Sequence, residues 1–143
     1  MHLKIFDLHN DTFTELFDLG TTLDDTRLSV NTSGLKQFRR SVCTYAVWLS
    51  GNEISPIDRY SRVLQNGKQQ LNDNGIGLCL TADDLLSREK HLALLSLEGG
   101  AVIDSVERVN DLYNDGIRTV SLTWNYDNHL AGGALENGSL TAF

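Results

Sequence analysis

The chain has 143 residues, of which 41% are hydrophobic and 22% are charged, a composition typical of a folded globular protein. Its 12 Lys and Arg against 19 Asp and Glu give a net charge of −7, which argues against nucleic-acid binding through phosphate attraction. No run of 18 apolar residues exists, and the N-terminus lacks the apolar stretch of a secretory signal. We therefore expect a cytoplasmic protein that does not associate with membranes.

Predicted strands and helices alternate along the chain. The strands are expected at residues 3–8, 42–48, 76–80, 91–97 and 117–123. Helices are expected from Asp11 or Thr12 to Gly20, from Ser55–Pro56 to Asn74–Gly75, briefly from Thr81, and from Asp104 to Gly116. Residues 21–40 are expected to form a loop with at most one turn of helix. Residues 124–142 are Gly- and Asn-rich and predict a second loop.

The alternation predicts an α/β fold with mostly parallel strands and right-handed crossovers. An open doubly wound sheet and a (β/α) barrel both fit this pattern. The chain ends in a loop after about four principal strands, whereas a complete eight-fold barrel needs about 250 residues. Residues 1–143 are therefore interpreted as a single partial domain.

Two further expectations concern packing. The last helix is expected to present an apolar stripe, with Asp104 and Glu107 at its start; the stripe comprises Val102, Val106, Val109, Leu112 and Tyr113. Cys43 and Cys79 lie in apolar surroundings without the spacing of a metal site. Buried, reduced thiols are the favoured interpretation, with a disulfide as the alternative.

The first candidate site lies at the end of the first predicted strand. On a regular strand Asp7, His9 and Asp11 share one face. Phe6 and Leu8 are then expected to point the other way and pack on helices. An imidazole and a carboxylate at the carboxyl end of a strand together suit zinc. The alternative is that Asp11 caps the following helix and His9 is a hydrogen-bonded core histidine.

The second candidate is Glu98, which directly follows a buried apolar strand and precedes Gly99 and Gly100. A carboxylate in such a position is costly unless it is paired or bound to metal. The alternative is a glutamate at the rim, in water, followed by a flexible turn. Because the carboxyl ends of parallel strands meet on one side of the sheet, Glu98 is expected to lie near His9 and Asp11.

The third candidate segment follows the strand at 117–123. Trp124, Asn125 and Tyr126 are predicted to line a substrate pocket, with aromatic packing inside the loop as the alternative. The other three histidines have no motif partner and are expected to be surface or ordinary core residues: His2, His91 and His129.

Taken together, these segments resemble the N-terminal half of the renal (membrane) dipeptidase family of zinc metallopeptidases, within the amidohydrolase superfamily. The matching stretches are Phe6–Asp11, Ser96–Gly100, Ile103–Asp104, Leu112–Arg118 and Val120–Asn125. The resemblance implies the N-terminal half, about four β/α units, of a (β/α)8 TIM-type barrel that holds two zinc ions.

By the same resemblance His9 and Asp11 would hold one zinc ion, while Glu98 would bridge both ions and be a catalytic residue. The family's remaining ligands are histidines on later strands, and a later acid assists proton transfer; these positions do not exist in this sequence. The implied reaction is hydrolysis of a dipeptide amide bond by a hydroxide that bridges the two metals. The chain alone is expected to be inactive and to need a C-terminal half.

One position departs from the family pattern. Members related to the kidney enzyme carry a substrate-contacting histidine where Trp124 stands here. This leaves open another amidohydrolase-type activity, on N-acyl amino acids or lactones. A further hypothesis is a non-catalytic half-barrel that forms a homo-oligomer through its open strand edges and uncovered apolar face.

Overall fold

The chain folds into one parallel sheet with helices packed on one face. The computed structural model describes residues 3–87, 90–136 and 138–142. Its elements are β1 (Lys4–Asn10), α1 (Thr12–Leu19), α2 (Thr32–Leu35), β2 (Arg40–Trp48), α3 (Pro56–Asp73), β3 (Gly77–Leu78), the 3₁₀ helix η1 (Asp83–Leu86), β4 (His91–Glu98), α4 (Val106–Asn114) and β5 (Ile117–Ser121). Each predicted element is present, although β3 is shorter than expected.

The strand order distinguishes the two folds that the sequence left open. β1 pairs with β2, β2 with β4, and β4 with β5, all in parallel. The two-residue strand β3 pairs with β4 near its start, at Leu92 and Ala93. The longer strands therefore neighbour one another in chain order, as in a (β/α) barrel, without the reversal of order that defines a doubly wound sheet. The predicted α/β class is confirmed, and the sheet fits part of a TIM-type barrel.

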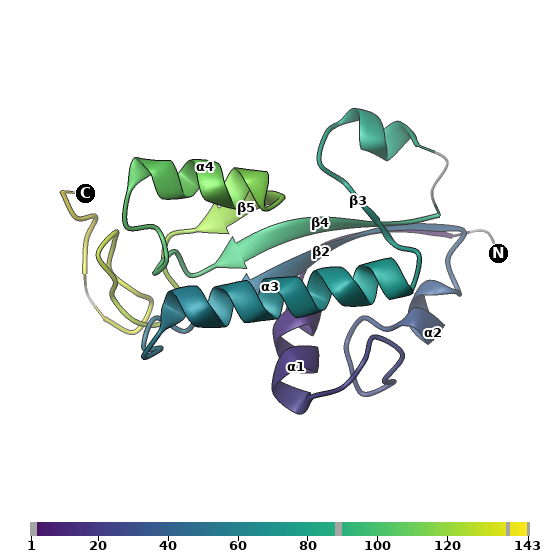
Figure 1. Ribbon diagram of the computed structural model, residues 1–143, viewed down its shortest axis with the longest axis horizontal. Coiled ribbons are helices and arrows are strands. Elements are labelled where there is room, and N and C mark those ends of the chain that lie inside the picture. The colour runs from purple at the N-terminus through teal and green to yellow at the C-terminus, as the bar shows by residue number, and fades with distance from the viewer. Residues whose placement is uncertain (1–2, 88–89, 137, 143) are drawn as a thin grey trace.

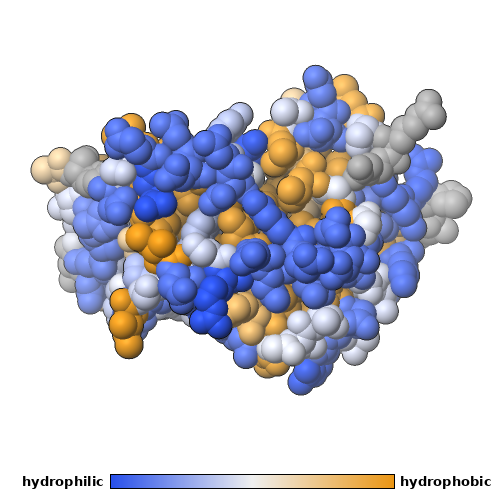
Figure 2. Space-filling view, in the orientation of Figure 1, coloured by the Kyte–Doolittle hydropathy of each residue, from blue (hydrophilic) through white to orange (hydrophobic). Residues whose placement is uncertain are grey.

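The main hydrophobic core lies between the sheet and helices α1 and α3. Figure 1 shows α3 running along β2 and β4, with α1 beside it. Phe13 from α1 and Tyr45 from β2 are fully buried there, and their rings stack with centroids 4.9 Å apart. Figure 2 shows that the outward surface over α3 is mainly hydrophilic, as expected for a helix that buries only one face.

Gly67 allows α3 to approach α1 closely. A Cβ at this position would lie closer than 3.0 Å to the ring of Phe13, which is enclosed by the core. We expect Gly67→Ala to destabilise the chain by up to about 2 kcal/mol, because overpacking costs about 1–3 kcal/mol and alanine regains roughly 1 kcal/mol in a helix. Urea unfolding measures this change. Gly34→Ala, which meets only ordinary contacts, is the control, and an equal effect of the two substitutions would contradict the argument.

The first strand corrects one prediction about side-chain direction. Phe6 pairs with Val42, which belongs to a small cluster with Leu92 on the sheet face opposite the main core. Phe6 is 49% exposed and Leu8 is 77% exposed, so neither packs on helices as predicted. The reason is a register shift between Asp7 and Asn10, where β1 advances three residues while β2 advances two.

The predicted apolar stripe of α4 is also wrong in part. Leu112 is buried, but Val106, Val109 and Tyr113 are 50–73% exposed. The helix packs mainly on β5, so only the face around Leu112 is covered. Its N-cap is Ser105, whose side chain accepts a hydrogen bond from the Arg108 amide, in place of the expected Asp104.

Both cysteines are buried and free, as the favoured interpretation predicted. Burial, together with the nearby Asp7 carboxylate, raises the pKa of the Cys43 thiol to about 11. Such a thiol is almost entirely protonated at neutral pH and is a poor nucleophile. Within the described residues, no helix has the length and apolar character needed to cross a membrane.

Candidate metal centre

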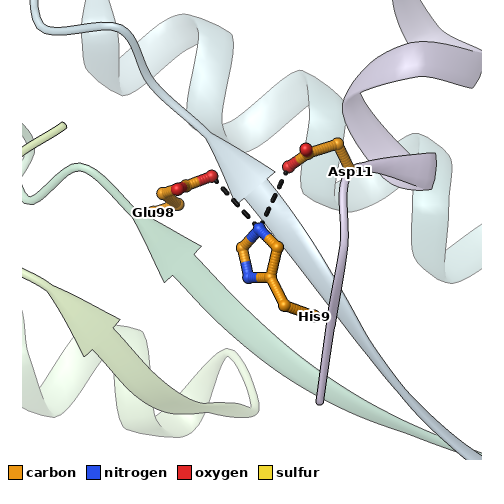
Figure 3. A group of neighbouring side chains, drawn as sticks. All are labelled: His9, Asp11 and Glu98. Carbon is orange, nitrogen blue, oxygen red and sulfur yellow. Dashed lines mark ion pairs between the residues drawn. The ribbon is translucent and has the colours of Figure 1, made fainter. Parts of the chain in front are cut away.

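Three side chains from two strand ends meet at one edge of the sheet. The Nε2 atom of His9 lies 3.4 Å from Oδ1 of Asp11 and 3.3 Å from Oε2 of Glu98. Figure 3 shows the imidazole directed between the two carboxylates. In the described part of the chain, this is the one group of three His, Cys, Asp or Glu residues whose ligand atoms all lie within 4.8 Å of one another. The structure thus brings together the three predicted ligands.

Asn10 fixes the end of β1, which carries His9 and leads into Asp11. Its buried side chain donates hydrogen bonds to the Asp7 carboxylate, at 2.7 Å, and to the Thr44 carbonyl, at 3.0 Å. The amide oxygen of Asn10 accepts a hydrogen bond from the backbone N–H of Thr12. These bonds tie the end of β1 to β2 and to the start of α1, so that the residues on either side of Asn10 have a defined position.

The alternative roles considered for His9 and Asp11 do not fit the structure. Asp11 occupies the N-cap position of α1, but its side chain makes no capping hydrogen bond to the described residues. Its Oδ1 atom is buried and accepts no hydrogen bond from the described residues, an unfavourable state that a cation would relieve. The His9 side chain is 46% exposed, which excludes the core-histidine interpretation.

Glu98 ends β4 in the middle of the sheet. It pairs with Trp48 of β2 and with Ser121 of β5, and its side chain is only 23% exposed. Burial raises the pKa of the Glu98 carboxyl above its usual value; the Asp11 charge adds to this and His9 opposes it. Glu98 is therefore not the solvated rim glutamate of the alternative interpretation.

The three side chains fit a zinc ion. Two ligands at zinc-type bond lengths of about 2.1 Å in tetrahedral geometry are separated by about 3.4 Å. The two separations measured from His9 Nε2 are 3.4 and 3.3 Å. One imidazole nitrogen and two carboxylate oxygens are donors that suit zinc. They supply three ligands, which leaves positions for further ligands, water or substrate.

A pocket of about 260 Å³, here called the tryptophan pocket, opens beside this group. It is lined by Asp11, Thr14, Glu15, Asp18, Trp48, Glu98 and Trp124. The rings of Trp48 and Trp124 meet edge to face, with centroids 4.8 Å apart. The Trp48 amide donates a hydrogen bond of 2.9 Å to the Thr14 hydroxyl, which joins the end of β2 to α1.

Of the three predicted substrate-binding residues, Trp124 lines the tryptophan pocket. Asn125 and Tyr126 are not among its lining residues. The Asn125 carbonyl accepts a hydrogen bond of 2.9 Å from the Leu135 amide, and Tyr126 lies against Gly51. Their role in substrate binding stays a prediction. Sequence reasoning missed Trp48, although its place at the carboxyl end of the predicted strand 42–48 was a usable signal.

The remaining histidines behave as predicted where they are described. His91 forms a hydrogen bond of 2.8 Å with the Ser41 hydroxyl, and the His129 ring contacts the Ile103 carbonyl. Neither belongs to the metal-ligating group. His2 lies outside the described residues.

Comparison with known proteins identifies the fold and the family of the chain. A crystal structure of an amidohydrolase from Pseudomonas aeruginosa superposes with a TM-score of 0.65 at 16% sequence identity, over 96% of this chain. The chain spans only 39% of the length of that protein. No curated protein matches the chain. The family model of the membrane dipeptidases, peptidase family M19, matches residues 1–142. The chain therefore belongs to the membrane dipeptidase family.

Proposed function

We propose that this chain contributes metal ligands to a zinc-dependent hydrolase that cleaves dipeptides. The observation that carries the proposal is the convergence of His9, Asp11 and Glu98 in a chain matched along almost its whole length by the membrane dipeptidase family. The amidohydrolase-like fold supports a barrel in which the carboxyl ends of the strands form the active site.

Each residue has a role that follows from its position. His9 and Asp11 flank Asn10 at the end of the edge strand β1 and would hold one ion. Glu98, whose Oε2 lies 3.3 Å from His9 Nε2, would hold the same ion, and by the family resemblance it would also hold a second ion. When bound, zinc would polarise a substrate carbonyl and activate water near neutral pH. Trp124 would form a wall against the substrate.

The test compares zinc content and hydrolysis in the full-length polypeptide that carries this sequence and in its His9→Ala and Asp11→Asn variants. We expect a dipeptide to be cleaved, and both variants to lose bound zinc and at least about 100-fold in kcat/KM, since even loss of a ligand's outer hydrogen-bond partner costs 10–100-fold. Glu107→Gln, on the exposed side of α4, is the control.

The substrate class is decided by a panel in the same experiment. Dipeptides, N-acyl amino acids and lactones are offered to the zinc-loaded protein, because Trp124 replaces the histidine of the kidney-type members. Cleavage of N-acyl amino acids or lactones without cleavage of any dipeptide would overturn the dipeptidase assignment and leave the metal site standing. Hydrolysis that survives in both ligand variants would overturn the metal site itself.

A further inference from the structure

The tryptophan pocket is larger than the metal ligands require. Asp11 and Glu98 form only part of its wall, and the rest comes from α1, from Trp48 and from Trp124. Its volume of about 260 Å³ is several times the roughly 30 Å³ that one water molecule takes in the liquid. A substrate group beyond the scissile bond can therefore occupy it.

The carboxylates of the pocket are not equivalent. Asp11 and Glu98 belong to the metal group. Asp18 forms two hydrogen bonds with the Arg59 guanidinium, at 2.9 and 2.8 Å, so that its charge is compensated. Glu15 lies half-buried in the first turn of α1, and the described residues offer its side chain no ion pair or hydrogen bond. It is the one pocket carboxylate whose charge is left for a ligand.

The aromatic walls favour the same kind of ligand. An indole ring attracts a cation placed over its face, and the attraction grows when the cation is removed from water. Trp48 and Trp124 are in contact with each other and line this pocket together with Glu15.

We propose that the tryptophan pocket binds the cationic side chain of an arginine or lysine residue in the substrate, with Glu15 as the specificity-determining carboxylate. The inference rests on the proposed function, because it makes a basic dipeptide the preferred substrate. A cationic side chain fits the pocket volume better than the α-ammonium group, which is much smaller than the space. Glu15 supplies the opposite charge and the tryptophans enclose the alkyl chain and the charged head.

The chain provides its own probe for the test, since its two tryptophans are Trp48 and Trp124 and both line the pocket. The 143-residue chain is loaded with zinc and titrated with L-argininamide and, separately, with L-citrullinamide, and its tryptophan fluorescence is recorded. The two ligands share the α-ammonium group and the shape of the side chain and differ in side-chain charge. We expect argininamide to bind at least ~10-fold more tightly, in line with a partly desolvated cation–π contact joined to an ion pair.

The variants assign this preference to a residue. Glu15→Gln should reduce the ratio of the two dissociation constants to about 2 or less, whereas Glu107→Gln should keep the ratio of the unmodified protein. Equal binding of the two ligands, or a preference that survives in Glu15→Gln, would overturn the proposal. A further outcome would also overturn the proposal. If citrullinamide binds more tightly than N-acetylcitrullinamide and argininamide is not preferred, the pocket binds the α-ammonium group and not a cationic side chain.

This test does not depend on hydrolysis. If the chain shows a fluorescence preference that requires Glu15 but the full-length polypeptide that carries it cleaves no dipeptide, the binding inference stands and the proposed reaction does not. If that polypeptide cleaves neutral dipeptides and the chain shows no preference for argininamide, the proposed reaction stands and the binding inference does not.

Discussion

Replacement of Gly99 by alanine should destabilise the chain by about 3 kcal/mol or more and abolish zinc binding. Gly99 directly follows Glu98 and has a φ of 91°, in the region that favours glycine. An added Cβ would lie closer than 3.0 Å to the carbonyl oxygen of Leu49, a backbone atom that cannot rotate away. The amide of Gly99 also donates a hydrogen bond of 3.0 Å to the Ser121 hydroxyl. Backbone strain at Gly99 and steric overlap with Leu49 therefore act together directly after Glu98, whose direction depends on this backbone.

Gly75→Ala separates these two effects. Gly75 has a φ of 64°, but an added Cβ would meet no described atom within 4 Å. We expect it to cost about 1–2 kcal/mol from backbone strain alone and to leave zinc binding intact. Urea unfolding and zinc titration of both variants measure the difference. If Gly99→Ala is no more destabilising than Gly75→Ala, the close contact between Gly99 and the Leu49 carbonyl is contradicted.

The second large effect concerns Glu98, whose carboxylate should destabilise the folded chain at neutral pH without metal and stabilise it when zinc is bound. Burial and the neighbouring Asp11 charge raise the pKa of Glu98, so the ionised carboxylate is disfavoured in the metal-free folded chain. A raised carboxyl pKa means that the folded state binds the proton more tightly than the unfolded state. Protonation of Glu98 therefore stabilises the folded state. This stabilisation is fully present below the ordinary glutamate pKa of 4.5 and is lost as the pH rises through the raised pKa of Glu98 in the folded state.

Glu98→Gln should therefore be more stable than the unmodified chain at pH 7 without metal, and the difference should shrink as the pH falls toward 4.5. Zinc should reverse the order. At a free zinc concentration of 100 times Kd, binding stabilises the unmodified chain by about 2.7 kcal/mol, and the variant should gain much less.

Thermal unfolding at several pH values measures the stability of the unmodified chain and of Glu98→Gln, each with zinc and with a chelator. Glu107→Gln, remote from the site on α4, should show neither the pH-dependent difference nor the reversal. Equal stabilisation of the unmodified chain and of Glu98→Gln by zinc would exclude Glu98 as a ligand.

The metal group could be predicted from the sequence because it depends on topology. His9 and Glu98 are 89 positions apart, but both stand at the carboxyl ends of parallel strands, and such ends share one side of the sheet. The parallel α/β class followed from the alternation of strand and helix patterns. Local patterns also gave the end of α1, where Gly20 adopts the left-handed conformation with a φ of 60°.

The parts that could not be predicted depend on contacts between segments. Strict alternation placed Phe6 on the helix side, whereas the register shift in β1 reverses it, and no residue in the sequence marks that shift. The apolar spacing of α4 did not reveal that Val106 and Val109 lie outside its contact with β5. The tryptophan pocket joins Glu15 of α1, Trp48 of β2 and Trp124 of the loop after β5, and their spacing along the chain contains no common pattern.

The extra residue in β1 makes the length of its final segment as important as its composition. Asp7 and Asn10 pair with Cys43 and Tyr45, so three steps of β1 match two steps of β2 in this segment. Deleting Leu8 would restore even pairing and leave His9 as the single residue between these two pairs. The placement of the imidazole therefore depends on the number of residues in this segment, and a single-codon deletion here should disturb the metal group more than a conservative substitution of Leu8.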